Sequence, residues 1–317
     1  MNPTIPGIHH ITALAGDPRR NVDFYTRVLG QRLVKRTVNF DDPGTYHLYY
    51  GDELGRPGTI LTFFPWPGAP RGRRGVGQAT VTAYRAPEGS LGYWKERLES
   101  RGLEVSTETR FEREVLRFED PDGLELELVA SEGGSSFVPW EDTDVPAEHA
   151  LRGFAGVTLG ESEFDPTSIF LTDVMGFRLE AEEGPRRRFE AGEGDGVAAI
   201  DVVKMPGVER GTIAAGSVHH IAWRTRDDEE QRAWQECLAA AGWSVTPVRD
   251  RQYFRSIYFH EPGGTLFEIA TDPPGFTADE SPKQLGSSLK LPPWLEPSRE
   301  RIEAVLPVLE PAARAAK

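Results

Sequence analysis

The chain has 317 residues, with 36 basic and 50 acidic side chains, so its formal charge at pH 7 is −14. This length suffices for two ordinary domains, and the acidic surplus argues against nucleic acid or an anionic membrane as partner. No apolar run is long enough to span a bilayer, and the first ten residues do not resemble a signal peptide, so we expect a cytoplasmic protein. The single cysteine, Cys237, excludes an internal disulfide and a cysteine-rich zinc site. We therefore expect any metal to be held by His and carboxylate side chains.

The first module, residues 7–66, begins with a strand predicted at Ile8–Ala15. A helix is expected over Arg19–Leu29, because its apolar residues recur at helical spacing and Gly30 follows as a stop signal. Three runs rich in β-forming residues come next, at Arg32–Phe40, Tyr46–Tyr50 and Thr59–Phe64.

The same plan of one strand, one helix and three strands recurs three times. The later modules cover residues 77–130, 151–205 and 217–272. Their helices are predicted at Ser90–Ser100, near Thr167–Met175 and at Glu229–Ala241, each stopped by a glycine. The remaining tail, residues 273–317, is irregular before a short helix predicted over Glu296–Leu309.

A module of this kind has one apolar face and cannot stand alone, so two modules must pair to form a curved sheet around a cavity. Four modules then form two half-barrels. The predicted fold class is α+β, with four βαβββ modules in two half-barrel domains and mostly antiparallel mixed sheets.

Two of the four first strands contain a pair of histidines inside an apolar run. His9 and His10 lie in the first module, and His219 and His220 lie at the equivalent place in the fourth. A single His in a strand is usually structural, but the coincidence of two pairs favours a shared site. Neighbouring residues of a strand point to opposite faces, so one His of each pair should be a direct ligand. The hydrophobic pattern does not decide which one, because both alternating sets contain apolar residues.

Glu268 supplies the third group, on the last strand of the fourth module. Its neighbours in the run from Leu266 to Ala270 are apolar, and a carboxylate buried there without a partner would be costly. Two His and one carboxylate, without Cys, form the facial triad of non-haem Fe(II), which leaves positions open for substrate and O₂.

A glyoxalase-type isomerase built from such repeats would want a second carboxylate on the partner module. Aligning Thr59 with Thr265 puts Thr62 where Glu268 lies, and this absence favours an oxygenase. If the two His pairs share one metal, the first module must pair with the fourth and the second with the third. Glu127 occupies the repeat position of Glu268 without a His pair, so we expect the second half-barrel to be structural and free of metal.

These residues resemble the vicinal oxygen chelate superfamily, which contains glyoxalases, bleomycin-resistance proteins and extradiol dioxygenases. More closely, the chain is similar to bacterial ring-cleaving dioxygenases that act on hydroquinones. The similarity extends nearly from end to end and departs from the family at Ala155, where a His is common. The matching stretches include IHHIT (Ile8–Thr12), the run Phe24–Pro43, the run Tyr46–Thr59, VPAEHALRGF (Val145–Phe154), VHHIAW (Val218–Trp223), the region Asp250–Glu268 and GFTADE (Gly275–Glu280).

The resemblance implies that the second His of each pair is the ligand, so that His10, His220 and Glu268 bind the metal. It also implies roles beside the metal for further residues, which are Arg251, Tyr258, His9, His219 and Thr12. Two other histidines are weaker indications of a site. His47 is expected to face the cavity from a strand rich in aromatic residues, and His149 is expected to be structural.

The predicted function is an Fe(II)-dependent dioxygenase that inserts O₂ into a hydroquinone-like ring during breakdown of aromatic compounds, with Mn(II) as the alternative metal. The competing hypotheses are a glyoxalase-type lyase or isomerase and a non-catalytic binding protein like the bleomycin-resistance proteins. The expected partners are a small aromatic substrate and O₂. The apolar segment Leu291–Leu295 is suited to cover the cavity mouth or to contact a second copy in a homo-oligomer.

Overall fold

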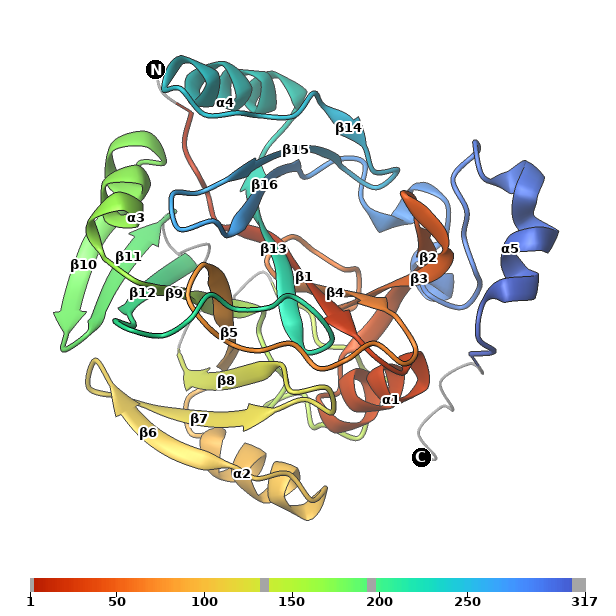
Figure 1. Cartoon of the computed structure of the whole chain (residues 1–317). Coiled ribbons are helices and arrows are strands. Elements are labelled where there is room, and N and C mark those ends of the chain that lie inside the picture. Colours follow the sequence, from red (N-terminus) through yellow and green to blue (C-terminus); the bar gives the residue numbers. More distant parts are fainter. Residues whose placement is uncertain (1–2, 132–136, 193–197, 310–317) are drawn as a thin grey trace.

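The structure is a computed structural model that describes residues 3–131, 137–192 and 198–309. Predicted segments that extend beyond these ranges, among them the end of the tail at 310–317, lie partly outside the described residues. Two curved sheets of eight strands each form the framework of the described part of the molecule (Figure 1). The predicted α+β class with two half-barrels is confirmed.

The first sheet joins strands from the two ends of the chain. It contains β1 (Ile8–Ala15), β2 (Arg32–Asn39), β3 (Asp42–Gly51), β4 (Ile60–Pro65), β13 (Ser217–Thr225), β14 (Arg249–Asp250), β15 (Arg255–His260) and β16 (Leu266–Thr271). Their order across the sheet is β14-β15-β16-β13-β1-β4-β3-β2, with β1 antiparallel to β13 at the centre.

The second sheet is built from the middle of the chain on the same plan. It contains β5 (Gln78–Ala86), β6 (Ser106–Arg110), β7 (Arg113–Glu119), β8 (Glu125–Ala130), β9 (Phe154–Glu161), β10 (Arg178–Glu183), β11 (Arg186–Ala191) and β12 (Ala198–Lys204). Their order is β10-β11-β12-β9-β5-β8-β7-β6, with β5 antiparallel to β9 at the centre. The two sheets therefore have equivalent topologies.

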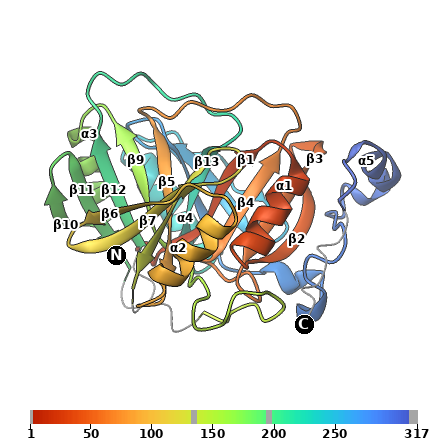
Figure 2. The same cartoon turned by 90° about the horizontal axis from the view of Figure 1, so that it is seen from below.

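Helices lie on the outer sides of the sheets (Figures 1 and 2). They are α1 (Pro18–Asp23), α2 (Leu91–Ser100), α3 (Asp165–Ile169), α4 (Asp228–Ala240) and α5 (Arg299–Val305). Two of them continue as single π-helical turns, η1 (Phe24–Val28) after α1 and η2 (Phe170–Val174) after α3. The remaining turns are 3₁₀-helical: η4 (Phe276–Ala278), η5 (Pro282–Gln284) and η6 (Glu296–Ser298). None of the described helices is both long and apolar enough to cross a bilayer.

The predicted helix over Glu296–Leu309 is too long. Only Arg299–Val305 is α-helical, because Leu306 takes the extended conformation that a residue before a proline prefers. The tail packs beside β2 and β3, where the exposed ring of Trp294 meets Phe40 edge to face at 5.6 Å.

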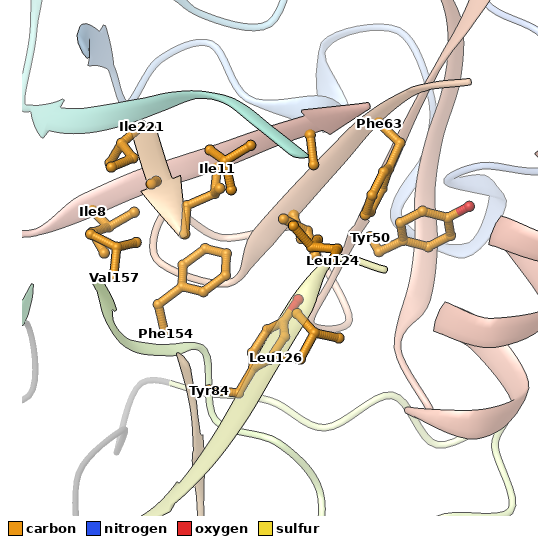
Figure 3. Packing of buried hydrophobic residues seen from close by; sticks show 14 of the residues in the cluster. Ile8, Ile11, Tyr50, Phe63, Tyr84, Leu124, Leu126, Phe154, Val157 and Ile221 are labelled. Atoms are coloured by element: carbon orange, nitrogen blue, oxygen red, sulfur yellow. The ribbon is translucent and has the colours of Figure 1, made fainter. Parts of the chain in front are cut away.

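A large hydrophobic core fills the space between the sheets (Figure 3). Ile11 on β1 and Ile221 on β13 point from the first sheet toward Tyr84 and Phe154 of the second. Because side chains alternate along a strand, their neighbours face the opposite, concave side of the first sheet. A second apolar cluster lines that concave side, so both faces of β1 are buried: Val34, Tyr49, Ile60, Ala222, Tyr253, Phe254, Ala270, Phe276 and Leu285.

Candidate metal centre and active-site cavity

Three buried side chains converge on the concave side of the first sheet. His10, His220 and Glu268 each offer one ligand atom, and these atoms all lie within 4.8 Å of one another. Glu268 Oε2 is 2.9 Å from His220 Nε2 and 3.5 Å from His10 Nε2. The two Nε2 atoms are 3.3 Å apart. Among the described residues this is the only such group of three or more His, Cys, Asp or Glu side chains.

The sheet topology brings these residues together from distant parts of the sequence. His10 is on β1 and His220 on β13, and the antiparallel register of these central strands places Thr12 opposite His220 and His10 opposite Ala222. Glu268 is on β16, beside Ala222 of the parallel strand β13. The site thus spans the line along which the first and fourth modules join.

Neighbouring side chains hold the three groups in place. The Nδ1 atom of His9 is 2.9 Å from His10 Nδ1, and the Nδ1 atom of His219 is 2.7 Å from His220 Nδ1. When each Nδ1 of His10 and His220 is occupied in this way, its Nε2 is left for the cluster. Ser256 donates a short hydrogen bond to Glu268 Oε1, which directs the other carboxylate oxygen toward the histidines.

Burial and nearby groups shift the pKa values of Glu268, His220 and His219. Burial would raise the pKa of Glu268, but the facing His10 and His220 rings outweigh it and hold this pKa well below its usual range. Burial lowers the pKa of His220, and burial together with the His220 ring lowers that of His219 to about 3. A neutral His220 imidazole beside the ionised Glu268 carboxylate is the combination that binds a divalent cation.

The donor set also contains an unsatisfied atom. Glu268 is fully buried, and its Oε2 has no hydrogen-bond partner although two imidazole nitrogens are close to it. An uncompensated carboxylate oxygen in an apolar interior is costly. A cation between Oε2 and the two Nε2 atoms would remove this cost, so the residues fit a metal ion.

A cavity of about 230 Å³ opens beside the three groups. Arg251 and Tyr258 line it together, and Arg251 Nε donates to the Tyr258 hydroxyl at 3.1 Å. Arg251 also pairs across the cavity with Asp41, at 3.0 Å between Nη1 and Oδ2. Burial raises the pKa of Tyr258, so its hydroxyl remains protonated. Aromatic rings supply the apolar walls of the cavity: Phe40, Tyr49, Phe64, Trp66 and Phe254.

His47 lines the cavity as well, on β3 of the first module. Its Nε2 is 2.8 Å from Thr62 Oγ1, and its Nδ1 is 2.8 Å from the Tyr49 hydroxyl. Thr12 is not among the residues that line the cavity, and its Oγ1 is 2.9 Å from the same Thr62 hydroxyl. His149, in contrast, lies away from the cluster, where it bonds Ser90 and stacks on Tyr93.

The strand registers define equivalent positions in the two modules. Glu268 lies beside Ala222, two residues after His220, and Thr62 lies beside Thr12, two residues after His10. Thr62 is therefore the counterpart of Glu268. It occupies the place of a second carboxylate, and its hydroxyl contacts Thr12 and His47 instead.

The same registers relate residues on the neighbouring strands. Ser256 on β15 and His47 on β3 are counterparts, as are Tyr258 and Tyr49, since Tyr258 pairs with Glu268 and Tyr49 with Thr62. Sequence reasoning named His47 and Tyr258 but missed Ser256. The alternation along β15 offered a signal for Ser256, which lies two residues before Tyr258. Asp41 had no such signal, because its contact with Arg251 bridges 210 positions of the chain.

The second sheet has different residues at the corresponding positions. Glu127 lies beside Ala83, two residues after Val81, and Asp201 lies beside Thr158, two residues after Gly156. Val81 and Gly156 thus stand where the first sheet has its histidines. Glu127 pairs with Arg110 at 2.6 Å, which compensates its buried charge without a metal.

The chain is similar to known proteins along nearly its whole length. The family described as the Glyoxalase/Bleomycin resistance protein/Dioxygenase superfamily matches residues 7–128 and 155–276. A protein of Bacillus subtilis (strain 168) named as a ring-cleaving dioxygenase, MhqO, is 50% identical over 94% of both chains. The chlorohydroquinone/hydroquinone 1,2-dioxygenase of Sphingobium indicum is 37% identical over 94% of this chain and 95% of its own. A crystal structure from Bacillus subtilis, of a protein named as a dioxygenase, superposes with a TM-score of 0.92 at 48% identity, over 97% of this chain and 98% of that one.

Proposed function

Because this chain belongs to the Glyoxalase/Bleomycin resistance protein/Dioxygenase superfamily, we propose that it is an Fe(II)-dependent ring-cleaving dioxygenase for hydroquinone-like aromatic compounds. The observation that supports this most strongly is the convergence of His10, His220 and Glu268, with a threonine at the position of a fourth ligand. Such a set occupies one face of a metal and suits non-haem Fe(II).

In this proposal His10, His220 and Glu268 hold the metal, and the neighbouring side chains orient them. His9 and His219 contact the Nδ1 atoms of the two ligand histidines, and Ser256 holds Glu268 Oε1. Partners of this kind fix the ring orientation and tautomer of ligand histidines. When bound, iron(II) supplies Lewis acidity toward a phenol oxygen and a coordination position for O₂.

The cavity suits a flat ring with an oxygen at one end. Phe64 and Phe254 provide apolar contact surface, and the ring oxygen would lie toward the three ligands, which also line the cavity. A hydroquinone has no two adjacent hydroxyls, so it would present one oxygen to the three ligand side chains. With a ring bound between the aromatic walls, water would be displaced and polar contacts inside the cavity would be strengthened.

Arg251 and Tyr258 are proposed to stabilise charge and to move a proton. The Arg251 guanidinium can hold an oxygen that becomes negatively charged, because its pairing with Tyr258 and Asp41 fixes it at the cavity wall. The Tyr258 oxygen accepts a hydrogen bond from Arg251 and its hydroxyl stays protonated, so Tyr258 can act as a proton donor at the cavity wall. His219 and Thr12 are proposed to support the site. His219 contacts the ligand His220, and Thr12 bonds Thr62.

Oxygen consumption distinguishes the proposal from its competitors. The protein is loaded anaerobically with Fe(II), and O₂ uptake is followed after addition of hydroquinone, catechol or a methylglyoxal–thiol adduct. We expect one O₂ consumed per hydroquinone cleaved and no O₂ consumed with the adduct. O₂-independent conversion of the adduct would instead favour a lyase or isomerase. Ligand binding without turnover of any compound would favour a non-catalytic binding protein.

A further inference from the structure

A second cavity lies in the second sheet, away from the metal centre. It measures about 280 Å³, slightly more than the first cavity, and strands β5 to β9, β11 and β12 line it. Its walls include the counterparts of the metal-site positions, namely Gly156, Glu127 and Asp201. The second sheet has therefore kept a hollow where the first sheet has its site.

This second cavity is not built for a metal. It has no His at the two counterpart positions, and two of its carboxylates, Glu127 and Asp201, are paired with arginines. Asp201 receives two hydrogen bonds from Arg188, at 2.8 and 2.9 Å, and one from Arg186 at 2.9 Å. Glu127 Oε2 receives one from Arg110 at 2.6 Å. Polar recognition by guanidinium and carboxylate groups is the chemistry available here.

One buried atom in this cavity lacks a partner. Glu127 is 2% exposed and lines the cavity, and its Oε1 has no hydrogen-bond partner among the described residues. A buried carboxylate oxygen left unpaired costs free energy, because it has lost its hydration without replacement. An amine or hydroxyl of a bound molecule would supply the missing donor.

The cavity also offers partners for an anion. Arginines from four strands line it, namely Arg85, Arg110, Arg113 and Arg188. Arg113 has no ion-pair partner within the described part of the chain, and Arg188 shares Asp201 with Arg186. A carboxylate is the group that a planar guanidinium recognises best.

We propose that the second cavity binds a small organic carboxylate that also carries an amine or hydroxyl hydrogen-bond donor. The carboxylate pairs with Arg113 and Arg188, the donor bonds Glu127 Oε1, and the body of the molecule packs on Val115 and Val129. The site is independent of the metal centre, because it is built entirely from the second sheet.

Binding of 4-aminobenzoate to the metal-loaded full chain tests this proposal by calorimetry. Benzoate lacks the donor and methyl 4-aminobenzoate lacks the charge, so each should bind about tenfold more weakly or worse. Glu127→Gln and Arg113→Ala should each weaken 4-aminobenzoate binding by about tenfold. Arg113 is exposed, so its variant keeps the test valid even if the Glu127 variant loses stability.

Two control variants locate the binding. Arg178→Ala removes an exposed arginine of the same sheet that does not line the cavity, and it should leave the affinity unchanged. His220→Ala disrupts the metal centre and should also leave it unchanged. The proposal is overturned by absence of saturable binding at millimolar concentration, by equal affinity for the three compounds, or by loss of binding in His220→Ala.

Discussion

The two sheets are equivalent in topology and differ in what their concave faces do. In the first sheet, His10 and His220 lie on the two central strands and Glu268 lies beside them. In the second, Val81 and Gly156 occupy the histidine positions, and Glu127 and Asp201 pair with arginines. The two sheets provide similar hollows, and a few side chains at matched positions decide which one can hold a metal. Function here depends on these positions and not on the fold.

The largest effect is expected from matched changes of the two counterpart glutamates. Glu268→Gln removes the anionic ligand, so metal affinity should fall by more than about 100-fold and O₂ uptake should be lost. Glu127→Gln should leave both unchanged, since that carboxylate pairs with Arg110. Metal analysis of the purified variants and O₂ electrode traces measure this. Equal metal loss in both variants would remove the distinction between the sheets.

A carboxylate added at the Thr62 position tests why the site has only three ligands. Thr62→Glu should retain the metal but reduce O₂ uptake on the order of 100-fold, because a fourth ligand would fill a position that substrate or O₂ requires. Thr62→Val, which removes the bonds to His47 and Thr12, serves as the control for packing and should lose much less activity. Full activity of a correctly folded Thr62→Glu protein would contradict the three-ligand assignment.

Ser256→Ala tests the positioning of Glu268. Loss of the hydroxyl that holds Oε1 should weaken metal binding by about 10- to 100-fold, the range found for groups that orient metal ligands. Competition with a chelator measures the affinity, and Ser256→Thr, which keeps a hydroxyl, should restore most of it. An unchanged affinity in Ser256→Ala would mean that Glu268 needs no such support.

The smallest effect is expected on stability, at the contact where Glu161 of the second sheet lies near Glu261, between strands β15 and β16 of the first. Burial and the nearby Glu261 carboxylate raise the pKa of Glu161 to about 8. The folded protein therefore binds a proton between about pH 4.5 and 8 that the unfolded chain has released, so stability should fall as pH rises through this window. Glu161→Gln should flatten the decline and stabilise the protein at pH 8 by on the order of 2 kcal/mol. Urea unfolding at several pH values measures this, and an unaltered pH profile would contradict it.

Much of the fold was predictable from local sequence patterns. The repeated modules and the first strand, Ile8–Ala15, follow from periodicity and glycine stops, because strands and helices express these patterns locally. The helical pattern did not distinguish the π-helical turns η1 and η2 from α-helix. In these turns the N–H of Leu29 bonds the carbonyl of Phe24, and Met175 bonds Phe170 in the same way.

The candidate site was predictable in its residue types and less so in its supporting contacts. The choice between His9 and His10 could not come from hydrophobic phase, since residues near the C-terminus, such as Phe276 and Leu285, bury the concave side of the sheet. Ion pairs such as Arg251 with Asp41 depend on distant modules meeting, which no local pattern encodes. The grouping of arginines in the second cavity could not be predicted for the same reason, because these residues come from several strands.

The most direct test of the central claim is anomalous diffraction at the iron edge from crystals of the Fe(II)-loaded protein. We expect one strong peak between His10, His220 and Glu268, and no peak in the cavity of the second sheet. A peak beside Glu127 or Asp201, or a peak in the first sheet that is not coordinated by Glu268, would contradict the account.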